Sequence, residues 1–175
     1  YILDSRRCIS YLTIENRGPI PREFRHAIGN RVYGCDDCQD VCPWNRFAHE
    51  GQLVTEFAPR RNNANPKLVD LLSMSDAQFR ERFKNSPVLR TKRGGFIRNV
   101  AVALGNSNDP EAVEPLVQQL TDADELVRGH VAWALGELGG KCATDALRRQ
   151  LDSETVPWVR DEINAALGDR ATSVE

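Results

Sequence analysis

Four of the five cysteines lie within the first 42 residues, and three of them form a C-x2-C-x3-C-P run made of Cys35, Cys38, Cys42 and Pro43. The two-residue spacing lets a tight turn aim two thiolates at one iron–sulfur cluster. In bacterial two-cluster ferredoxins, the cysteine before the proline ligates the other cluster. Cys8 is the natural further thiol of this segment. We therefore expect Cys8, Cys35 and Cys38 to supply three ligands of one 4Fe-4S cluster, and Cys42 to reach toward a second one.

The same thiols allow other interpretations. A structural zinc ion could use all four, although zinc sites more often pair two C-x2-C knuckles and only one is present here. A disulfide or free thiols are a third possibility. The odd cysteine count does not fit a secreted disulfide framework, so a reducing compartment is expected. Cys142 has no cysteine or histidine near it in sequence, and we expect a packed or free thiol.

Other features of the sequence bear on completeness and catalysis. The single methionine is Met74, so Tyr1 is not a natural start, and the chain is expected to be a piece whose remaining cluster ligands lie upstream. His26, His49 and His130 show no ligand spacing, and no catalytic Ser/His/Asp or Cys/His pairing is apparent. They are expected to be surface or core histidines.

Short helices are expected around the cysteines. A helix is predicted over residues 22–28, where Gly29 would end it. Asn65 followed by proline predicts the start of a second helix. Ser75 is expected to cap a third, which runs through Phe83. Nowhere does a long alternation of apolar and polar residues predict a strand.

The last eighty residues repeat one pattern. Residues 100–105, 131–136 and 163–168 align at offsets of 31 and 32, each with alanines before a closing Leu-Gly. Between them, residues 115–120 and 146–151 align at an offset of 31. Each unit therefore predicts two short amphipathic helices, which must stack on their neighbours to bury their apolar faces. The pattern resembles short HEAT-like repeats.

These observations predict a mainly α fold in which a ferredoxin-like half-module for two 4Fe-4S clusters precedes an α-solenoid of HEAT-like repeats. The expected boundaries are 1–63 for the iron–sulfur module, 64–93 for a helical connector with a basic patch, and 94–175 for the repeats. No apolar run approaches the roughly 18 residues that a membrane span needs, so no membrane contact is expected.

Charge is distributed unevenly along the chain. The net charge is −2, yet residues 1–98 carry 17 Lys/Arg against 11 Asp/Glu, and the remainder carries 6 against 14. The basic residues gather at the junction of the two halves, where the candidates for contacting nucleic acid are Arg90, Lys92, Arg93 and Arg98. A basic loop at the start of the first repeat helix suits phosphates, and few aromatics accompany it, so an RNA read by shape is favoured over base stacking. The alternative is an ordinary solvated basic face.

Several segments together resemble one known family. Residues 4–15 (DSRRCISYLTIE), 28–39 (IGNRVYGCDDCQ), 42–45 (CPWN) and 98–106 (RNVAVALGN) resemble those of epoxyqueuosine reductases. The resemblance covers essentially the whole chain and corresponds to the C-terminal portion of that family. It implies a cytoplasmic oxidoreductase that removes the epoxide oxygen of epoxyqueuosine at the tRNA wobble position. It also implies two 4Fe-4S clusters that pass single electrons to cobalamin.

The resemblance assigns roles to individual residues. Cys8, Cys35 and Cys38 match the second-cluster ligands, Cys42 matches the final ligand of the first cluster, and Ser10 lies in the segment beside the cobalamin. The implied partners are a tRNA anticodon stem-loop, docked with help from the repeats, and an external electron donor. A monomer is expected.

The family's cobalamin domain, catalytic acid and upstream C-x2-C-x2-C-x3-C-P run have no counterpart in this sequence. The chain alone is therefore expected to be inactive. The alternative from another class is a binding module, in which a ferredoxin-type unit is fused to a HEAT scaffold without tRNA activity.

Overall fold

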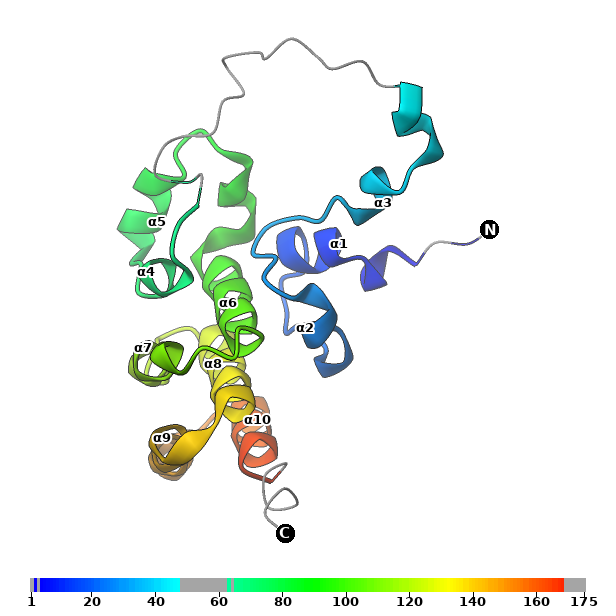
Figure 1. Ribbon diagram of the computed structural model, residues 1–175. Coiled ribbons are helices and arrows are strands. Elements are labelled where there is room, and N and C mark those ends of the chain that lie inside the picture. The colour runs from blue at the N-terminus through cyan, green and yellow to red at the C-terminus, as the bar shows by residue number, and fades with distance from the viewer. Residues whose placement is uncertain (1, 3, 48–62, 64, 169–175) are drawn as a thin grey trace.

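The computed structural model describes residues 2, 4–47, 63 and 65–168 (Figure 1). Within these residues every regular element is a helix, so the predicted mainly α fold is confirmed. Across the same part of the chain, no helix has the length and apolar character that crossing a membrane requires.

The first part, which we call the cluster module, contains the cysteine-rich segment. Its elements in chain order are η1 (Ser5–Arg7), α1 (Ile9–Ile14), α2 (Arg22–Ile28), α3 (Asp37–Asp40) and η2 (Pro43–Phe47). The predicted helix over 22–28 is confirmed, and Gly29 ends it with a φ of 60°, a conformation that favours glycine.

The connector holds α4 (Leu68–Leu72), α5 (Asp76–Arg82) and η5 (Pro87–Thr91). The capping prediction for Ser75 is confirmed: its hydroxyl accepts a hydrogen bond from the Gln78 amide at 3.3 Å, and its own amide donates to the Gln78 side chain at 2.8 Å. The predicted helix start at Asn65 is wrong. The backbone of Lys67 is extended, and α4 begins only at Leu68. This start lets Leu71 and Leu72 be buried.

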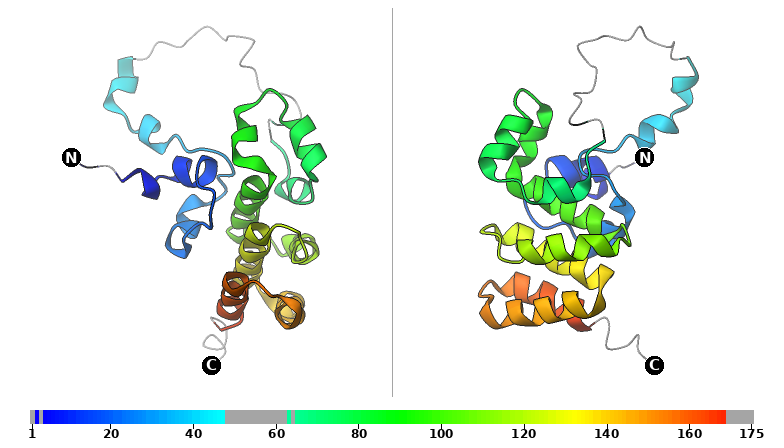
Figure 2. Two further views of the ribbon diagram at one scale, coloured as in Figure 1. Left: turned by 180° about the vertical axis from the view of Figure 1, so that it is seen from behind. Right: turned by 60° about the vertical axis from the view of Figure 1, so that its left-hand side comes forward.

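The repeats form two rows of helices. One row contains α6 (Lys92–Gly105), α8 (Glu125–Leu138) and α10 (Pro157–Gly168), which pack side by side. The other row contains α7 (Val113–Gln119), preceded by η6 (Pro110–Ala112), and α9 (Gly140–Ser153). Figure 2 shows the resulting stack, with the cluster module against the α6 end. The three aligned segments of the sequence fall on α6, α8 and α10, which confirms the repeat prediction.

Glycine at the end of the first two Ala-Leu-Gly signatures allows these helices to approach closely. A Cβ added to Gly105 would lie 3.0 Å from the Cα of Ala134, and one added to Gly136 would lie 3.0 Å from the Cα of Ala166. Both neighbouring atoms are backbone atoms that cannot rotate away. The spacing of the row therefore depends on these glycines.

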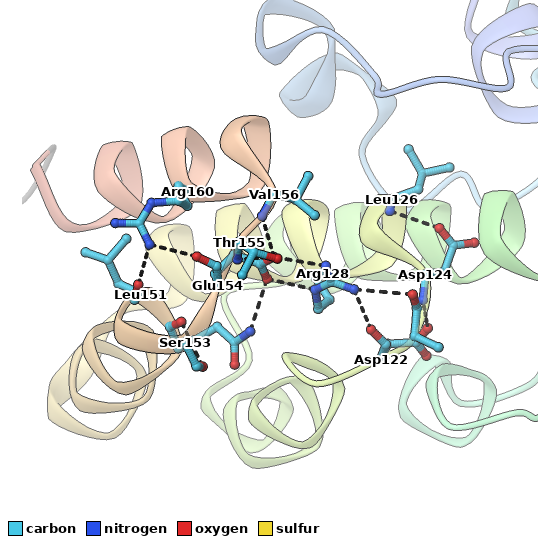
Figure 3. A network of polar contacts seen from close by, with 12 residues as sticks. Asp122, Asp124, Leu126, Arg128, Leu151, Ser153, Glu154, Thr155, Val156 and Arg160 are labelled. Atoms are coloured by element: carbon cyan, nitrogen blue, oxygen red, sulfur yellow. Dashed lines mark hydrogen bonds and ion pairs between the residues drawn. The ribbon is translucent and has the colours of Figure 1, made fainter.

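A network of polar contacts runs along the loops of the repeats (Figure 3). Arg128 donates to both carboxylate oxygens of Glu154 at 2.8 and 2.9 Å and to the Asp122 carbonyl at 2.8 Å. Arg160 donates to the carbonyl of Glu154 at 2.7 Å. The hydrogen bond from Arg128 lowers the pKa of the Glu154 carboxyl to about 2. The network therefore links consecutive repeats through charged groups that stay ionised at neutral pH.

Candidate iron–sulfur and nucleic-acid sites

Four of the five cysteines belong to the cluster module, whose α3 lies away from the repeats (Figure 1). Cys8 is the residue before α1, and Cys35 lies in the loop before α3. Cys38 is within α3 and Cys42 follows it. All five thiols of the chain, including Cys142, are free of disulfides. Cys142 is exposed within α9, with its sulfur 3.8 Å from a carboxylate oxygen of Glu114.

The donor set has the chemistry of an iron–sulfur site. Three free thiols have a ferredoxin-type spacing and Cys8 adds a fourth, and thiolates are the ligands that such clusters use. Among the described residues, no three His, Cys, Asp or Glu side chains are grouped as a site for a metal ion. Arg31 pairs with Asp37 at 2.8 Å and also interacts with Cys35, which brings a positive charge beside this thiol.

Buried hydrogen bonds tie the two cysteine-bearing segments to each other. The Gly34 amide, next to Cys35, donates to the Thr13 hydroxyl on α1 at 3.0 Å. The side-chain amide of Asn99 on α6 donates to the carbonyls of Thr13 at 2.7 Å and Val32 at 2.8 Å. The first repeat helix is therefore part of the support of the cysteine site.

Arg98 is not part of the predicted nucleic-acid surface, because it is buried. Arg98 is only 1% exposed, and its guanidinium donates hydrogen bonds to the carbonyls of Leu12, Asn16 and Gly18 at 2.8, 2.9 and 2.7 Å. Burial lowers its pKa to about 10, against an opposing effect of Asp124. Arg98 therefore does not face solvent where a phosphate could reach it, and its inclusion among the phosphate-binding residues was wrong.

Arg93 is also engaged within the protein. Its guanidinium makes two hydrogen bonds to the Asp122 carboxylate, at 3.0 and 2.6 Å, and a third to the Met74 carbonyl at 2.6 Å. The hydrogen bond to Asp122 raises the pKa of Arg93. This pair neutralises the charge of Arg93 and anchors α6 to the loop before α8.

The exposed basic residues form a smaller surface, which we call the basic junction: Arg17, Arg90 and Lys92. Arg90 has 62% of its side chain exposed and pairs with Glu15. Arg17 donates a hydrogen bond to the Arg90 carbonyl, which places a cluster-module side chain beside the connector. Sequence reasoning did not include Arg17, because nothing local links it to residues more than seventy positions away.

Lys92 occupies a strained corner. The predicted basic loop is in fact η5 followed directly by α6, and Lys92 makes the bend with φ 58° and ψ 167°. This region is populated almost only by glycine, and a side chain there costs about 1–3 kcal/mol. Buried Thr91 on one side and the Arg93–Asp122 pair on the other hold the bend.

The nearby aromatic residues are internal. Phe79, Phe83 and Phe96 pack on one another with ring centroids 4.9–5.4 Å apart, and all three are buried. Their rings therefore cannot stack on bases, which agrees with the expectation that base stacking is not used on this surface. Charge is therefore the means by which this surface could bind nucleic acid.

The remaining predicted residues are placed as follows. Ser10 is half-buried on α1. His26 is on the surface and His130 is in the core, as expected, and His49 lies outside the described residues. Burial lowers the pKa of His130, whose Nε2 accepts a hydrogen bond from the Ile20 amide at 3.0 Å.

Fold and cysteine pattern together define the class: an iron–sulfur-type cysteine module joined to a helical-repeat domain. Residues 1–45 match the family model of a 4Fe-4S double cluster binding domain, and residues 93–168 match that of HEAT repeats. The first match favours iron–sulfur clusters over zinc at these cysteines.

Comparison with known proteins narrows the class. An epoxyqueuosine reductase of Pseudomonas aeruginosa is 50% identical over 141 residues, with 79% of this chain and 38% of the relative covered. One from Salmonella typhimurium is 47% identical, with 78% and 35% covered. A crystal structure of epoxyqueuosine reductase with a tRNA-Tyr epoxyqueuosine-modified tRNA stem loop superimposes with a TM-score of 0.86 at 36% identity, covering 95% of this chain and 44% of that one.

The chain is thus related to the epoxyqueuosine reductases. It spans a little over a third of the length of the curated relatives it matches.

Proposed function

We propose that the chain is the C-terminal portion of an epoxyqueuosine reductase, in which it supplies iron–sulfur ligands and part of a tRNA-docking surface. The observation that carries this proposal is the ferredoxin-type cysteine run, held against HEAT repeats, in a chain about half identical to enzymes of that name. The solved relative with a bound tRNA stem loop supports tRNA as the partner. A cytoplasmic location, a monomeric state and an external electron donor belong to the same proposal.

Cys8, Cys35 and Cys38 would hold one 4Fe-4S cluster, and Cys42 would complete a second. The clusters, when bound, supply one-electron transfer. Cobalamin is proposed from the resemblance, with Ser10 beside it; when bound, it supplies the chemistry that reduces the epoxide. The catalytic acid and the other cluster ligands would come from the part of the enzyme that these residues do not include, so the chain alone would be inactive.

The basic junction would contact the tRNA backbone. Arg17, Arg90 and Lys92 come from the cluster module, the connector and the first repeat helix, so the three parts of the chain would meet the RNA together. Lysine and arginine bind phosphates with little regard to sequence, and the affinity falls steeply with salt.

Anaerobic reconstitution with iron and sulfide tests the cluster assignment. We expect the chain to take up iron and sulfide and turn brown, and Cys8→Ser to lose most of this uptake. Cys142→Ser is the matched control, because its thiol lies on α9 and should leave uptake unchanged. Tight zinc binding without visible absorption would contradict the proposal.

A salt titration of tRNA binding tests the docking surface. Reversing Arg90 and Lys92 to glutamate should weaken binding and reduce the slope of log affinity against log salt by about 1 per lost phosphate contact. Reversing Arg148 and Arg149, which are exposed on α9, makes the same change in charge elsewhere. Equal affinities for the wild type and the Arg90/Lys92 variant would instead favour a binding module without tRNA activity.

An activity assay tests the division of labour. The reconstituted chain, supplied with cobalamin, a reductant and tRNA carrying epoxyqueuosine, should form no queuosine. Detectable product would contradict the proposal that the catalytic groups lie elsewhere.

A further inference from the structure

Buried or half-buried polar side chains on the row formed by α6, α8 and α10 hold the segment between Cys8 and Cys35. They are Arg98, Asn99, Asn106, His130 and Glu162, and each bonds to a group within residues 12–32. Three of them are on α6 or directly follow it, one is on α8 and one is on α10. The repeats thus contact the cluster module through directed hydrogen bonds as well as apolar packing.

Arg98 connects most directly to Cys8. Its guanidinium donates to the Leu12 carbonyl at 2.8 Å, and the Leu12 amide donates in turn to the Cys8 carbonyl at 2.9 Å. Two further carbonyls beyond α1, those of Asn16 and Gly18, also accept from Arg98. One side chain therefore fixes the helix that Cys8 begins and the turn that follows it.

Asn99 connects to the segment of Cys35. Its amide bridges Thr13 on α1 and Val32, while the Thr13 hydroxyl accepts from the Gly34 amide. Arg98 donates to the Asn99 side-chain oxygen at 2.9 and 3.0 Å, which orients the amide so that its nitrogen faces both carbonyls. The two neighbours act as one unit that reaches both cysteine-bearing segments.

The other buried contacts are farther from the cysteines. Arg25 on α2 pairs with Glu162 on α10 at 2.8 and 2.9 Å and lies over the Trp133 ring. Asn106 donates to the carbonyls of Arg25 and Gly29 at the end of α2. These contacts fasten α2, whereas Arg98 and Asn99 fasten the segments that bear the ligands.

Arg98 also brings a positive charge into the module. Among the described residues no carboxylate forms an ion pair with it; carbonyl and amide oxygens accept its hydrogen bonds, and Asp124 acts on its charge only from a distance. A cluster held by thiolates is negatively charged, and reduction adds one more negative charge. A buried cation in the segment that carries the ligands favours the reduced form, because the low-dielectric interior screens the attraction weakly.

We propose that Arg98 and Asn99 are positioning residues for the iron–sulfur cluster: they hold the Cys8 helix and the Cys35 loop in register, and the charge of Arg98 raises the cluster's reduction potential. This inference rests on the proposed iron–sulfur function. It assigns to the first repeat helix a role in electron transfer in addition to any role in RNA docking.

The test compares Arg98→Met, Arg98→Lys and Asn99→Leu with wild type, each chain reconstituted anaerobically with a small thiol present to complete the iron coordination. Iron and sulfide per chain, the EPR spectrum of the reduced cluster and its midpoint potential are measured. We expect Arg98→Met to take up several-fold less cluster and its remaining cluster to have a lower potential. Arg98→Lys should keep the potential near wild type with reduced uptake, because it keeps the charge and loses hydrogen bonds. Asn99→Leu should reduce uptake.

The matched control is Arg160→Met, which also removes an arginine that donates to two carbonyls, here those of Leu151 and Glu154 in the last repeat. It should destabilise the chain without changing cluster content or potential.

The two possible failures are distinguishable. Absence of a cluster in the wild-type chain would contradict the iron–sulfur function itself. A wild-type cluster content, EPR spectrum and potential in Arg98→Met would contradict the role of Arg98. If Arg98→Met does not fold, an altered EPR spectrum or reduced uptake in Arg98→Lys supports the proposal, and wild-type values for both contradict it.

Discussion

The repeats and the cysteine arm, residues 35–47, differ in what their apolar side chains contact. In the repeats, Val131 and Leu135 are completely buried between neighbouring helices. In the arm, Val41 is 80% exposed, Trp44 76% and Phe47 58%. The repeats therefore hold their structure by packing, whereas the arm gains little from burial within this chain. We infer that apolar burial in the repeats stabilises the folded chain, and that the structure of the arm depends on what its cysteines bind.

Removing one apolar side chain from each region tests this difference in stability. Leu135→Ala should lower the free energy of unfolding by about 2–5 kcal/mol, because it leaves a cavity in the buried core of the repeats. Val41→Ala should change it by less than about 0.5 kcal/mol, because its side chain is exposed. Urea denaturation of the cluster-free chain measures both. A larger loss from Val41→Ala would contradict the division.

Acid should act on the repeats through Glu154. The Arg128 hydrogen bonds lower the pKa of this carboxyl from 4.5 to about 2 in the folded protein. Its stabilising contribution is therefore complete above pH 4.5 and is lost as the pH falls toward 2, by on the order of 2 kcal/mol. Glu154→Gln should be less stable at pH 7 and should lack this component of the pH dependence. Parallel urea midpoints for the two proteins across that range would contradict the assignment.

The close approach of α6 and α8 gives a third test. Gly105→Ala should cost about 1–3 kcal/mol, since the new Cβ meets the Ala134 backbone at 3.0 Å. Gly168→Ala is the matched control, because a Cβ there meets nothing within 4 Å. Thermal unfolding compares them. Equal melting temperatures would show that the row of helices can adjust its spacing.

The smallest expected effect separates strain from charge at Lys92. Lys92→Gly should raise the free energy of unfolding by about 1 kcal/mol because glycine tolerates the bend, while weakening tRNA binding. Lys92→Ala loses the same charge and keeps the strained conformation, so its affinity should match that of Lys92→Gly without the gain in stability. Identical stabilities of the two variants would argue against the strain.

Features fixed by neighbouring residues could be predicted from the sequence. The Ser75 capping box needs only residues three positions apart, and the repeat register follows from a pattern seen three times. Arg98 was misassigned because its carbonyl acceptors are eighty or more residues away, and an arginine in a basic segment looks the same in sequence whether it is exposed or buried. The bend at Lys92 was predicted as a loop for a related reason: burial of Thr91 and pairing of Arg93 set it, and both depend on distant groups.

The cysteine spacing favoured an iron–sulfur site over zinc, and the match of residues 1–45 to a 4Fe-4S double cluster binding domain agrees with that preference; the individual ligands stay a prediction. The support of the cysteines by the repeats could not be predicted. Asn99 donates hydrogen bonds to the carbonyls of Thr13 and Val32, and only the tertiary fold brings these three segments together.

We propose that these cysteines hold a 4Fe-4S cluster on a module supported by the repeats. EPR spectroscopy of the anaerobically reconstituted chain, reduced with dithionite, tests it most directly. We expect the signal of a one-electron-reduced 4Fe-4S cluster, present in wild type and Cys142→Ser and strongly diminished in Cys8→Ser. A wild-type chain that gives no such signal and retains zinc instead would contradict it.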